Sequence, residues 1–408
     1  MEQRHKSSFF FAVTLRQFAL PEYSESSQFN SKTFQMQYKK FSSKFALAAV
    51  ATAAALFLVG CGGGGGSSSD AGQSTSTGTG NTGNTGNTGN TGSGGSNGGT
   101  GSENPKTQVA TEAAGPSPSL GASDCAALTA ASVAVPTISG ADMQEVSDVL
   151  STQDPTHAYE VFKRAPQEVM WWVRSAGRSV SLSGIGTGVH EATHSIDSTL
   201  SFSCFGDTLA RYYGNGQILT SGTHRGDTAN RSIVSSTLPP ALQTSRALRY
   251  DLYITGSASV PTSDFAALLE EFNAYVGAAA VEVAVRSNPQ LSYLYESNVA
   301  ADEDVGGTVD FMMFMQYYLQ AARGFEPATY AQISAQPATI AVMQSLWTRA
   351  EQILQAAYPH STKATGGAGT VVPVDALTAI YSSPMLAELD SLGITHKTAA
   401  DWSTTYFK

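Results

Sequence analysis

Basic side chains and cysteines are both scarce in this sequence. The 23 Lys and Arg residues are outnumbered by 33 Asp and Glu, so the formal net charge is −10. Binding to nucleic acid requires a basic surface, and its absence excludes nucleic acid as a partner. The 3 cysteines lie far apart, and none has a second Cys or a His at ligand spacing beside it, so a cysteine-ligated metal is not expected.

The sequence also lacks a long apolar run and a phosphate-binding loop. The apolar stretch 45–59 is too short and too poorly flanked for a stable membrane-spanning helix. The glycines of 366–369 are not followed by Lys and Ser or Thr at P-loop positions, which indicates an ordinary loop. The stretch 45–59 instead follows Lys39, Lys40 and Lys44 and leads into small residues, the pattern of a secretory signal.

The end of this signal, Leu58-Val59-Gly60-Cys61, resembles the lipobox of bacterial lipoproteins. The resemblance implies that Cys61 is lipidated and anchors the mature protein to a membrane of the cell envelope, and Gly62 after it resembles the outer-membrane sorting pattern. The alternative is a plain secreted protein that is cleaved nearby. We expect translation to start at Met36, because a signal peptide does not need the 35 residues before it.

Composition divides the chain into three parts. Residues 1–61 form the signal region with its lipobox. Residues 62–107 are almost entirely Gly, Ser, Thr and Asn, a composition that behaves as a flexible coil with a root-mean-square reach of roughly 35–40 Å at this length. We therefore expect a tether that carries a single catalytic domain, residues 108–408.

Cys125 and Cys204 remain after lipidation of Cys61. In an oxidising compartment outside the cytoplasm, an even pair of cysteines predicts a disulfide. This bond would close a loop of about 80 residues, worth up to roughly 4–5 kcal/mol in the chain-entropy model. Two unpaired buried thiols are the alternative.

Hydrophobic patterning of the domain predicts an α+β fold that is mainly helical. Apolar residues at helical spacing predict helices at 142–150, 166–176, 262–286, 308–323, 338–358, 374–381, 384–391 and 398–406. Alternation predicts short strands at 178–183 and 250–254, and Asn215-Gly216 predicts a hairpin within 209–220. The glycines of 184–188 predict a turn, since glycine is unfavourable inside a helix.

The strongest chemical signal is His190-Glu191-Ala192-Thr193-His194. On a helix, residues four apart share a face, so His190 and His194 can direct both imidazoles at one metal ion. At 100° per residue, the two histidines and Asp197 fall beside a narrow apolar stripe made by Ile185, Val189, Ile196 and Leu200. The segment therefore predicts a helix with one buried edge and one metal-binding face.

A catalytic zinc site uses three protein ligands and leaves a fourth position for water. On the predicted helix 262–286, helical phase directs Glu271 toward the protein and Glu270 toward water. Glu271 is therefore the candidate third ligand. Asp310 is the runner-up, because Gly307-Thr308-Val309-Asp310 resembles part of the aspzincin motif.

The motif His190-Glu191-x-x-His194, followed by Glu271-Phe272-Asn273-Ala274-Tyr275, resembles zincin metallopeptidases of the gluzincin type. The resemblance implies a zincin-like catalytic domain in which a Glu on a later helix is the third ligand of one Zn²⁺ per chain. In such a site Glu191 accepts a proton from water and passes it to the leaving amine.

Three further residues are candidates for supporting roles. Asp197, one turn after His194, is placed to accept a hydrogen bond from a ligand imidazole, and the alternative is a solvated helix carboxylate. Tyr275 or His224 is a candidate stabiliser of the transition state, with a structural role as the alternative for each.

These observations predict a zinc-dependent endopeptidase that acts on peptide or protein substrates and is anchored to the cell envelope through Cys61. A second possibility is a non-catalytic surface or binding lipoprotein in which the motif holds a structural or vestigial metal. A third is metal-dependent hydrolysis of a non-peptide amide or ester, which would use the same water.

Overall fold

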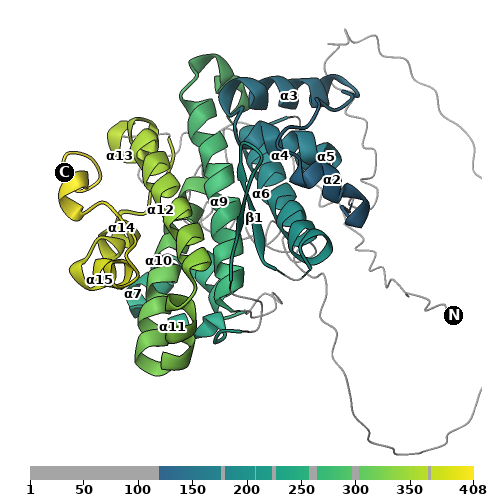
Figure 1. Cartoon of the computed structure of the whole chain (residues 1–408). Helices are drawn as coiled ribbons and strands as arrows, with labels where there is room; N and C mark the ends of the chain where they lie inside the picture. Colours follow the sequence, from purple (N-terminus) through teal and green to yellow (C-terminus); the bar gives the residue numbers. More distant parts are fainter. Residues whose placement is uncertain are drawn as a thin grey trace, which may run out of the picture. The chain divides into compact units, whose positions relative to one another are not determined.

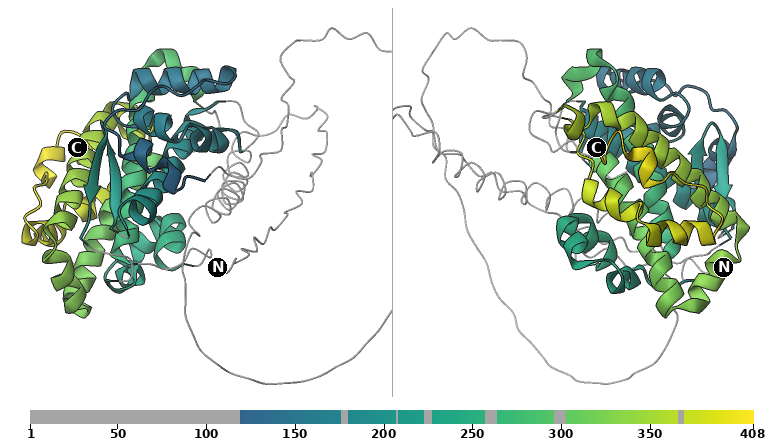
Figure 2. Two further views of the ribbon diagram at one scale, coloured as in Figure 1. Left: turned by 45° about the vertical axis from the view of Figure 1, so that its right-hand side comes forward. Right: turned by 90° about the vertical axis from the view of Figure 1, so that its left-hand side faces the viewer.

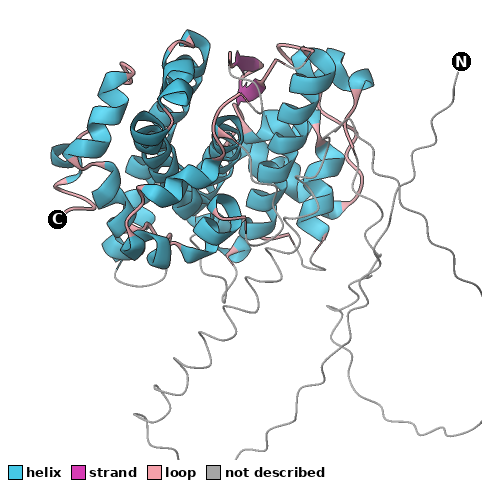
Figure 3. Cartoon of the chain, turned by 90° about the horizontal axis from the view of Figure 1, so that it is seen from below, coloured by secondary structure: helices cyan, strands magenta, loops and turns pink. Residues whose placement is uncertain are grey.

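Helix α9 (Phe265–Arg286) runs between two hydrophobic cores and contributes side chains to both. The computed structural model describes residues 119–175, 180–206, 208–222, 227–256, 264–295, 303–365 and 369–408. Within these residues the chain is mainly helical and has one two-stranded antiparallel sheet, which confirms the predicted mainly helical α+β class (Figure 1 and Figure 3).

The remaining helices differ widely in length. They are α2 (Cys125–Thr129), α3 (Ala141–Gln153), α4 (Ala158–Arg164), α5 (Pro166–Arg174), α6 (Leu182–Thr199), α7 (Pro240–Ser245), α8 (Ala247–Arg249), α10 (Glu303–Phe325), α11 (Pro327–Ser334), α12 (Pro337–Ala357), α13 (Thr362–Thr365), α14 (Val374–Ile380) and α15 (Ser383–Ser391). The N-terminal helices α2 to α5 and the C-terminal helices α12 to α15 lie on opposite sides of α9 (Figure 1; two further views are in Figure 2).

The predicted helices agree with α3, α5, α9, α10, α12, α14 and α15. The expected helix at 398–406 is reduced to a 3₁₀ turn, Ala399–Trp402. The sequence pattern missed α2, α4, α7, α8, α11 and α13, which are short and therefore show little periodicity.

The glycine-rich stretch 184–188 is helical, and the prediction of a turn there is wrong. It forms the first half of α6, where a Cβ at Gly188 would lie 2.8 Å from the Val169 carbonyl oxygen of α5. A Cβ at Gly186 would collide with the Asp304 carboxylate of α10. Glycine lets both neighbours approach the backbone of α6, and this close packing offsets its cost inside a helix.

The predicted hairpin is confirmed. Strands β1 (Ala210–Gly214) and β2 (Gln217–Thr220) pair antiparallel, with Tyr212 opposite Ile218. Asn215 and Gly216 connect them with positive φ angles of 51° and 69°, the conformation of a type I′ turn. Strand β1 packs against α6 and α9, so the hairpin covers one side of this helix pair.

The predicted strand at 250–254 is wrong, because Tyr250–Ile254 forms a π-helical turn that follows α8. Asp251 is exposed while the other four residues of the turn are buried in the larger core. A short apolar run of this kind does not distinguish strand from helix. Of the other predicted strand, 178–183, residues 178 and 179 lie outside the described residues, and Leu182 and Ser183 begin α6.

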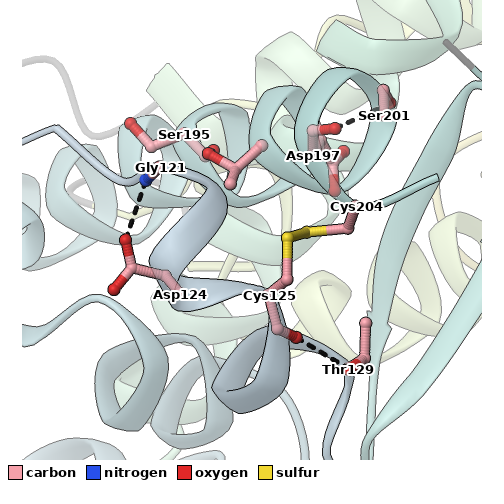
Figure 4. The surroundings of a disulfide bond; sticks show 9 residues. Gly121, Asp124, Cys125, Thr129, Ser195, Asp197, Ser201 and Cys204 are labelled. Atoms are coloured by element: carbon pink, nitrogen blue, oxygen red, sulfur yellow. Dashed lines mark hydrogen bonds between the residues drawn. A yellow bond between two sulfur atoms is a disulfide. The ribbon is translucent and has the colours of Figure 1, made fainter. Parts of the chain in front are cut away.

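A disulfide joins Cys125 to Cys204, as predicted, across a sequence separation of 79 residues (Figure 4). Helix α6 continues into a π turn, Leu200–Cys204, which ends at this bond. The Ser201 hydroxyl donates to the Asp197 carbonyl (2.7 Å) and accepts from the Ala210 N–H (2.9 Å). The end of α6 is thereby fixed to both α2 and β1.

The predictions for residues 1–61 with Cys61, for the tether 62–107 and for His224 lie outside the described residues. In the part of the chain that the structure describes, no helix combines the length and the apolar character needed to cross a membrane.

Candidate metal centre

Helix α6 places both histidines of the motif on one buried face. The helix starts at the N-cap residue Ser181, whose hydroxyl accepts a hydrogen bond from the Gly184 N–H (3.1 Å). One turn apart, His190 and His194 bring their Nε2 atoms to 3.1 Å from each other. The predicted convergence of the two imidazoles is therefore present.

Helix α9 packs along α6 and brings Glu271 to the same point. The Glu271 Oε2 atom lies 3.3 Å from His194 Nε2 and 3.7 Å from His190 Nε2. These three residues are the one group in the described part of the chain that offers at least three potential ligand atoms together. The structure thus places Glu271 where the sequence predicted the third ligand.

The distances between the ligand atoms fit a single small cation. Tetrahedral zinc with bonds of about 2.0–2.1 Å separates its ligand atoms by about 3.3–3.4 Å. The three separations here are 3.1, 3.3 and 3.7 Å. The side chains are therefore already close to the positions that metal binding would require.

Glu270 is buried, and the prediction that it faces water is wrong. Only 7% of the residue is exposed. Its Oε1 lies 3.5 Å from His194 Nδ1, and its Oε2 lies 3.6 Å from an Arg211 nitrogen. Almost every residue of α9 is buried. The helix therefore has no side that faces water, and helical phase alone could not predict the surroundings of Glu270.

Asp197 does not hold a ligand imidazole, and this prediction is also wrong. Its carboxylate accepts hydrogen bonds from the Tyr212 N–H (2.7 Å) and the Asn273 side-chain amide (2.9 Å). Arg211 Nε lies 3.9 Å away. The alternative of a solvated carboxylate fails as well, because Asp197 is fully buried. Asp197 instead connects α6 with β1 and α9.

The protonation states of two ligands suit a divalent cation. Burial lowers the pKa of His190 to about 4, so the imidazole is neutral near pH 7, as a metal ligand must be. Burial alone would raise the pKa of Glu271, but the attraction of His194 and the close approach of both imidazoles, 3.3 and 3.7 Å from its Oε2, lower it to about 2. Glu271 is therefore an anion that a cation would balance.

Glu191 lies beside the ligands on α6 and is buried. Burial raises its pKa to about 8, and the charges of Glu271 and Glu168 act in the same direction, while His194 opposes them. The metal-free protein therefore keeps Glu191 protonated at neutral pH. A bound cation would lower this pKa and convert Glu191 into a base.

Tyr275 contacts the site through its ring. The ring centroid lies 4.5 Å from that of His190, and the hydroxyl interacts with the Tyr253 hydroxyl (3.2 Å) and Arg249 Nε (3.4 Å). Tyr275 therefore packs against His190, and its role as a stabiliser of the transition state stays a prediction.

Asp310 is not part of the metal group, so the runner-up third ligand is wrong. Its two carboxylate oxygens accept hydrogen bonds from Arg246 Nε (2.6 Å) and Arg246 Nη2 (3.0 Å). Arg249 Nη1 donates a further bond of 3.2 Å. The Asp310 carboxylate, which the resemblance to the aspzincin motif suggested as a ligand, is therefore already bound by two guanidinium groups.

Sequence reasoning missed the supporting residues Arg211, Glu270 and Asn273. Arg211 is the second residue of β1, and only 1% of its surface is exposed. A basic residue within a predicted apolar strand is a weak signal of a buried ion pair, but it does not identify the partner. In the sequence, nothing but its position two residues after Glu271 marks Asn273.

Comparison with family models, with curated proteins and with solved structures gave no match to this chain. The functional assignment therefore depends on the chemistry of the site.

Proposed function

We propose that this protein is a zinc-dependent endopeptidase with a zincin-type site of the gluzincin kind. The observation that carries the proposal is the convergence of His190, His194 and Glu271 at 3.1–3.7 Å. A Glu directly after the first histidine supports it further, since this is the position of the general base in His-Glu-x-x-His enzymes.

The residues divide the reaction between them. His190, His194 and Glu271 would hold Zn²⁺, which when bound lowers the pKa of water and polarises the scissile carbonyl. Glu191 takes the proton from the attacking water and delivers it to the leaving amine. Burial raises the pKa of Glu191, which makes its carboxylate, once a bound cation has displaced the proton, a stronger base toward water.

The number of ligands favours a catalytic site over the alternative, a non-catalytic lipoprotein with a structural or vestigial metal. Structural zinc sites are closed by four protein ligands, whereas catalytic sites have three and leave one position open. The group in the described residues contains three ligands. All three residues are buried, and burial alone is equally compatible with a structural metal.

The substitution Glu191→Gln tests the catalytic proposal. It removes the base but no ligand, so zinc should remain bound at one ion per chain while peptide cleavage falls by about 10²–10⁴-fold. His194→Ala should lose both zinc and activity. Zinc is measured by elemental analysis after dialysis, and cleavage with an unbiased peptide library.

A matched control is Glu326→Gln, which makes the same change at an exposed position. It should leave zinc content and cleavage unchanged. Full activity of Glu191→Gln would exclude the proposed mechanism, and bound zinc without any cleavage in the wild type would favour a structural metal.

We also propose that the protein acts at the cell envelope through a lipid on Cys61. The lipobox-like sequence before Cys61 supports an anchor, and the Cys125–Cys204 disulfide supports an oxidising compartment. Labelled fatty acid should be incorporated into the wild type and not into Cys61→Ser. Equal labelling of both would contradict the anchor.

A further inference from the structure

Two adjacent glutamates of α9 approach His194 from different sides. Glu271 Oε2 lies 3.3 Å from the Nε2 atom, which faces the other ligands, whereas Glu270 Oε1 lies 3.5 Å from the Nδ1 atom on the opposite side of the ring. His194 is thus held between two carboxylates, and only one of them is in the metal group.

Glu270 is itself held by a buried cation. Its Oε2 lies 3.6 Å from Arg211 Nη2, which also donates to the Ala266 carbonyl (3.2 Å), while Arg211 Nη1 donates to the Ala210 carbonyl (2.9 Å). These backbone bonds fix the guanidinium between β1 and the first turn of α9. The position of Glu270 is therefore determined by two elements.

We propose that Glu270 is a positioning residue that orients His194 for metal binding, and that Arg211 anchors Glu270 in this role. Glu270 keeps the proton of the neutral imidazole on Nδ1, so that Nε2 presents its lone pair to the cation. A carboxylate in this position also makes the imidazole more basic and therefore a stronger metal ligand. The inference rests on the proposed metal site but not on peptide cleavage.

The alternative carboxylate on α6 is excluded from this role by its contacts. Asp197 directs one oxygen to the Tyr212 N–H and the other to the Asn273 amide. Arg211 lies between Asp197 and Glu270, at 3.9 and 3.6 Å. The arginine thus balances two buried carboxylates, of which only Glu270 reaches a ligand.

Zinc affinity of the metal-free protein measures this role directly. Glu270→Gln preserves size but removes the charge, and it should weaken zinc binding by about 10–100-fold in a competition titration. The matched control is Glu282→Gln, another buried glutamate of the same helix, which contacts Thr370, Arg286 and the Val305 N–H. Glu282→Gln should leave the zinc affinity at the wild-type value, even if it lowers stability.

The tautomer of His194 separates orientation from a general structural effect. Nitrogen-15 NMR of the metal-free wild type should show the proton of neutral His194 on Nδ1, and Glu270→Gln should shift the ring toward a mixture of tautomers. Circular dichroism of both variants verifies that they fold.

Each outcome decides one question. Equal zinc affinity of folded Glu270→Gln and wild type overturns the inference, as does a wild-type His194 that carries its proton on Nε2. Absence of zinc binding by the wild type would overturn the proposed metallopeptidase instead, and the tautomer measurement would still test Glu270.

Discussion

The Asp197 carboxylate accepts a 2.7 Å hydrogen bond from the backbone N–H of Tyr212 and thereby connects α6, which carries His190 and His194, to the β hairpin. Its second oxygen accepts a bond from Asn273 on α9. These contacts therefore connect α6, β1 and α9 without involving His190, His194 or Glu271.

Asp197→Asn should lower stability with little effect on zinc binding. The amide keeps only one acceptor oxygen and places an NH2 group against one of the two buried donors, so the free energy of unfolding should fall by about 1–3 kcal/mol. Urea unfolding measures this loss. Asp197→Asn should weaken zinc binding less than Glu270→Gln does. A greater loss of zinc affinity in Asp197→Asn would indicate that Asp197, and not Glu270, orients an imidazole.

Asp310→Asn should likewise affect stability and not metal binding. It removes the charge that Arg246 and Arg249 share at 2.6–3.2 Å and leaves two guanidinium groups in a largely buried site, at a cost of about 3–5 kcal/mol. Thermal unfolding and zinc titration of the variant provide the measurements. The comparison variant, Glu271→Gln, should lose zinc binding, and loss of zinc from folded Asp310→Asn would restore Asp310 as a ligand candidate.

Gly188→Ala tests the close packing of α5 on α6. The new Cβ would lie 2.8 Å from the Val169 carbonyl oxygen, which forces the helices apart and should destabilise the protein by about 1–3 kcal/mol. Gly324 of α10 is a suitable control, since a Cβ there meets nothing within 4 Å, and alanine should be neutral or stabilising. Equal stability of the two variants in chemical denaturation would argue against the packing role of Gly188.

Glu191 should make the stability of the metal-free protein depend on pH. Its pKa is raised from 4.5 to about 8 in the folded state, so between these values the folded protein holds a proton that the unfolded chain has released. The stability that this proton contributes is complete below pH 4.5 and is lost as the pH rises through 8.

Glu191→Gln cannot titrate and removes this contribution. The difference in unfolding free energy between wild type and variant should therefore change with pH by up to about 1.4 kcal/mol per unit. Comparing the two proteins cancels the contributions of other buried groups, such as Asp197. A difference that stays constant from pH 5 to 8 would show that Glu191 is not protonated in the folded protein.

Several features could be predicted because they depend on neighbouring residues alone. The spacing of His190 and His194 defines a shared helical face, and Asn215-Gly216 defines a tight turn with positive φ angles. The disulfide could be predicted by elimination, since lipidation of Cys61 would leave only one possible pair.

Other features could not be predicted because packing overrides local preference. The glycines of 184–188 lie in a helix because α5 and α10 pack so closely against its backbone that a Cβ would not fit at Gly188 or Gly186. Residues Tyr250–Ile254 form a helical turn in a core that surrounds them almost completely. In both cases distant segments supply the contacts that decide the conformation.

The sequence by itself determined that His190 and His194 share one helical face with Glu191 beside them, because helical periodicity is a local property of the chain. Only the tertiary structure decided which of the nearby carboxylates completes the site. Asp197, Glu270, Glu271 and Asp310 are the same kind of group, and all four are buried. The packing of α9 and β1 across α6 directs Glu271 to the ligands, Glu270 to the far side of His194 and Asp197 to the hairpin, since each carboxylate lies where buried donors are within reach.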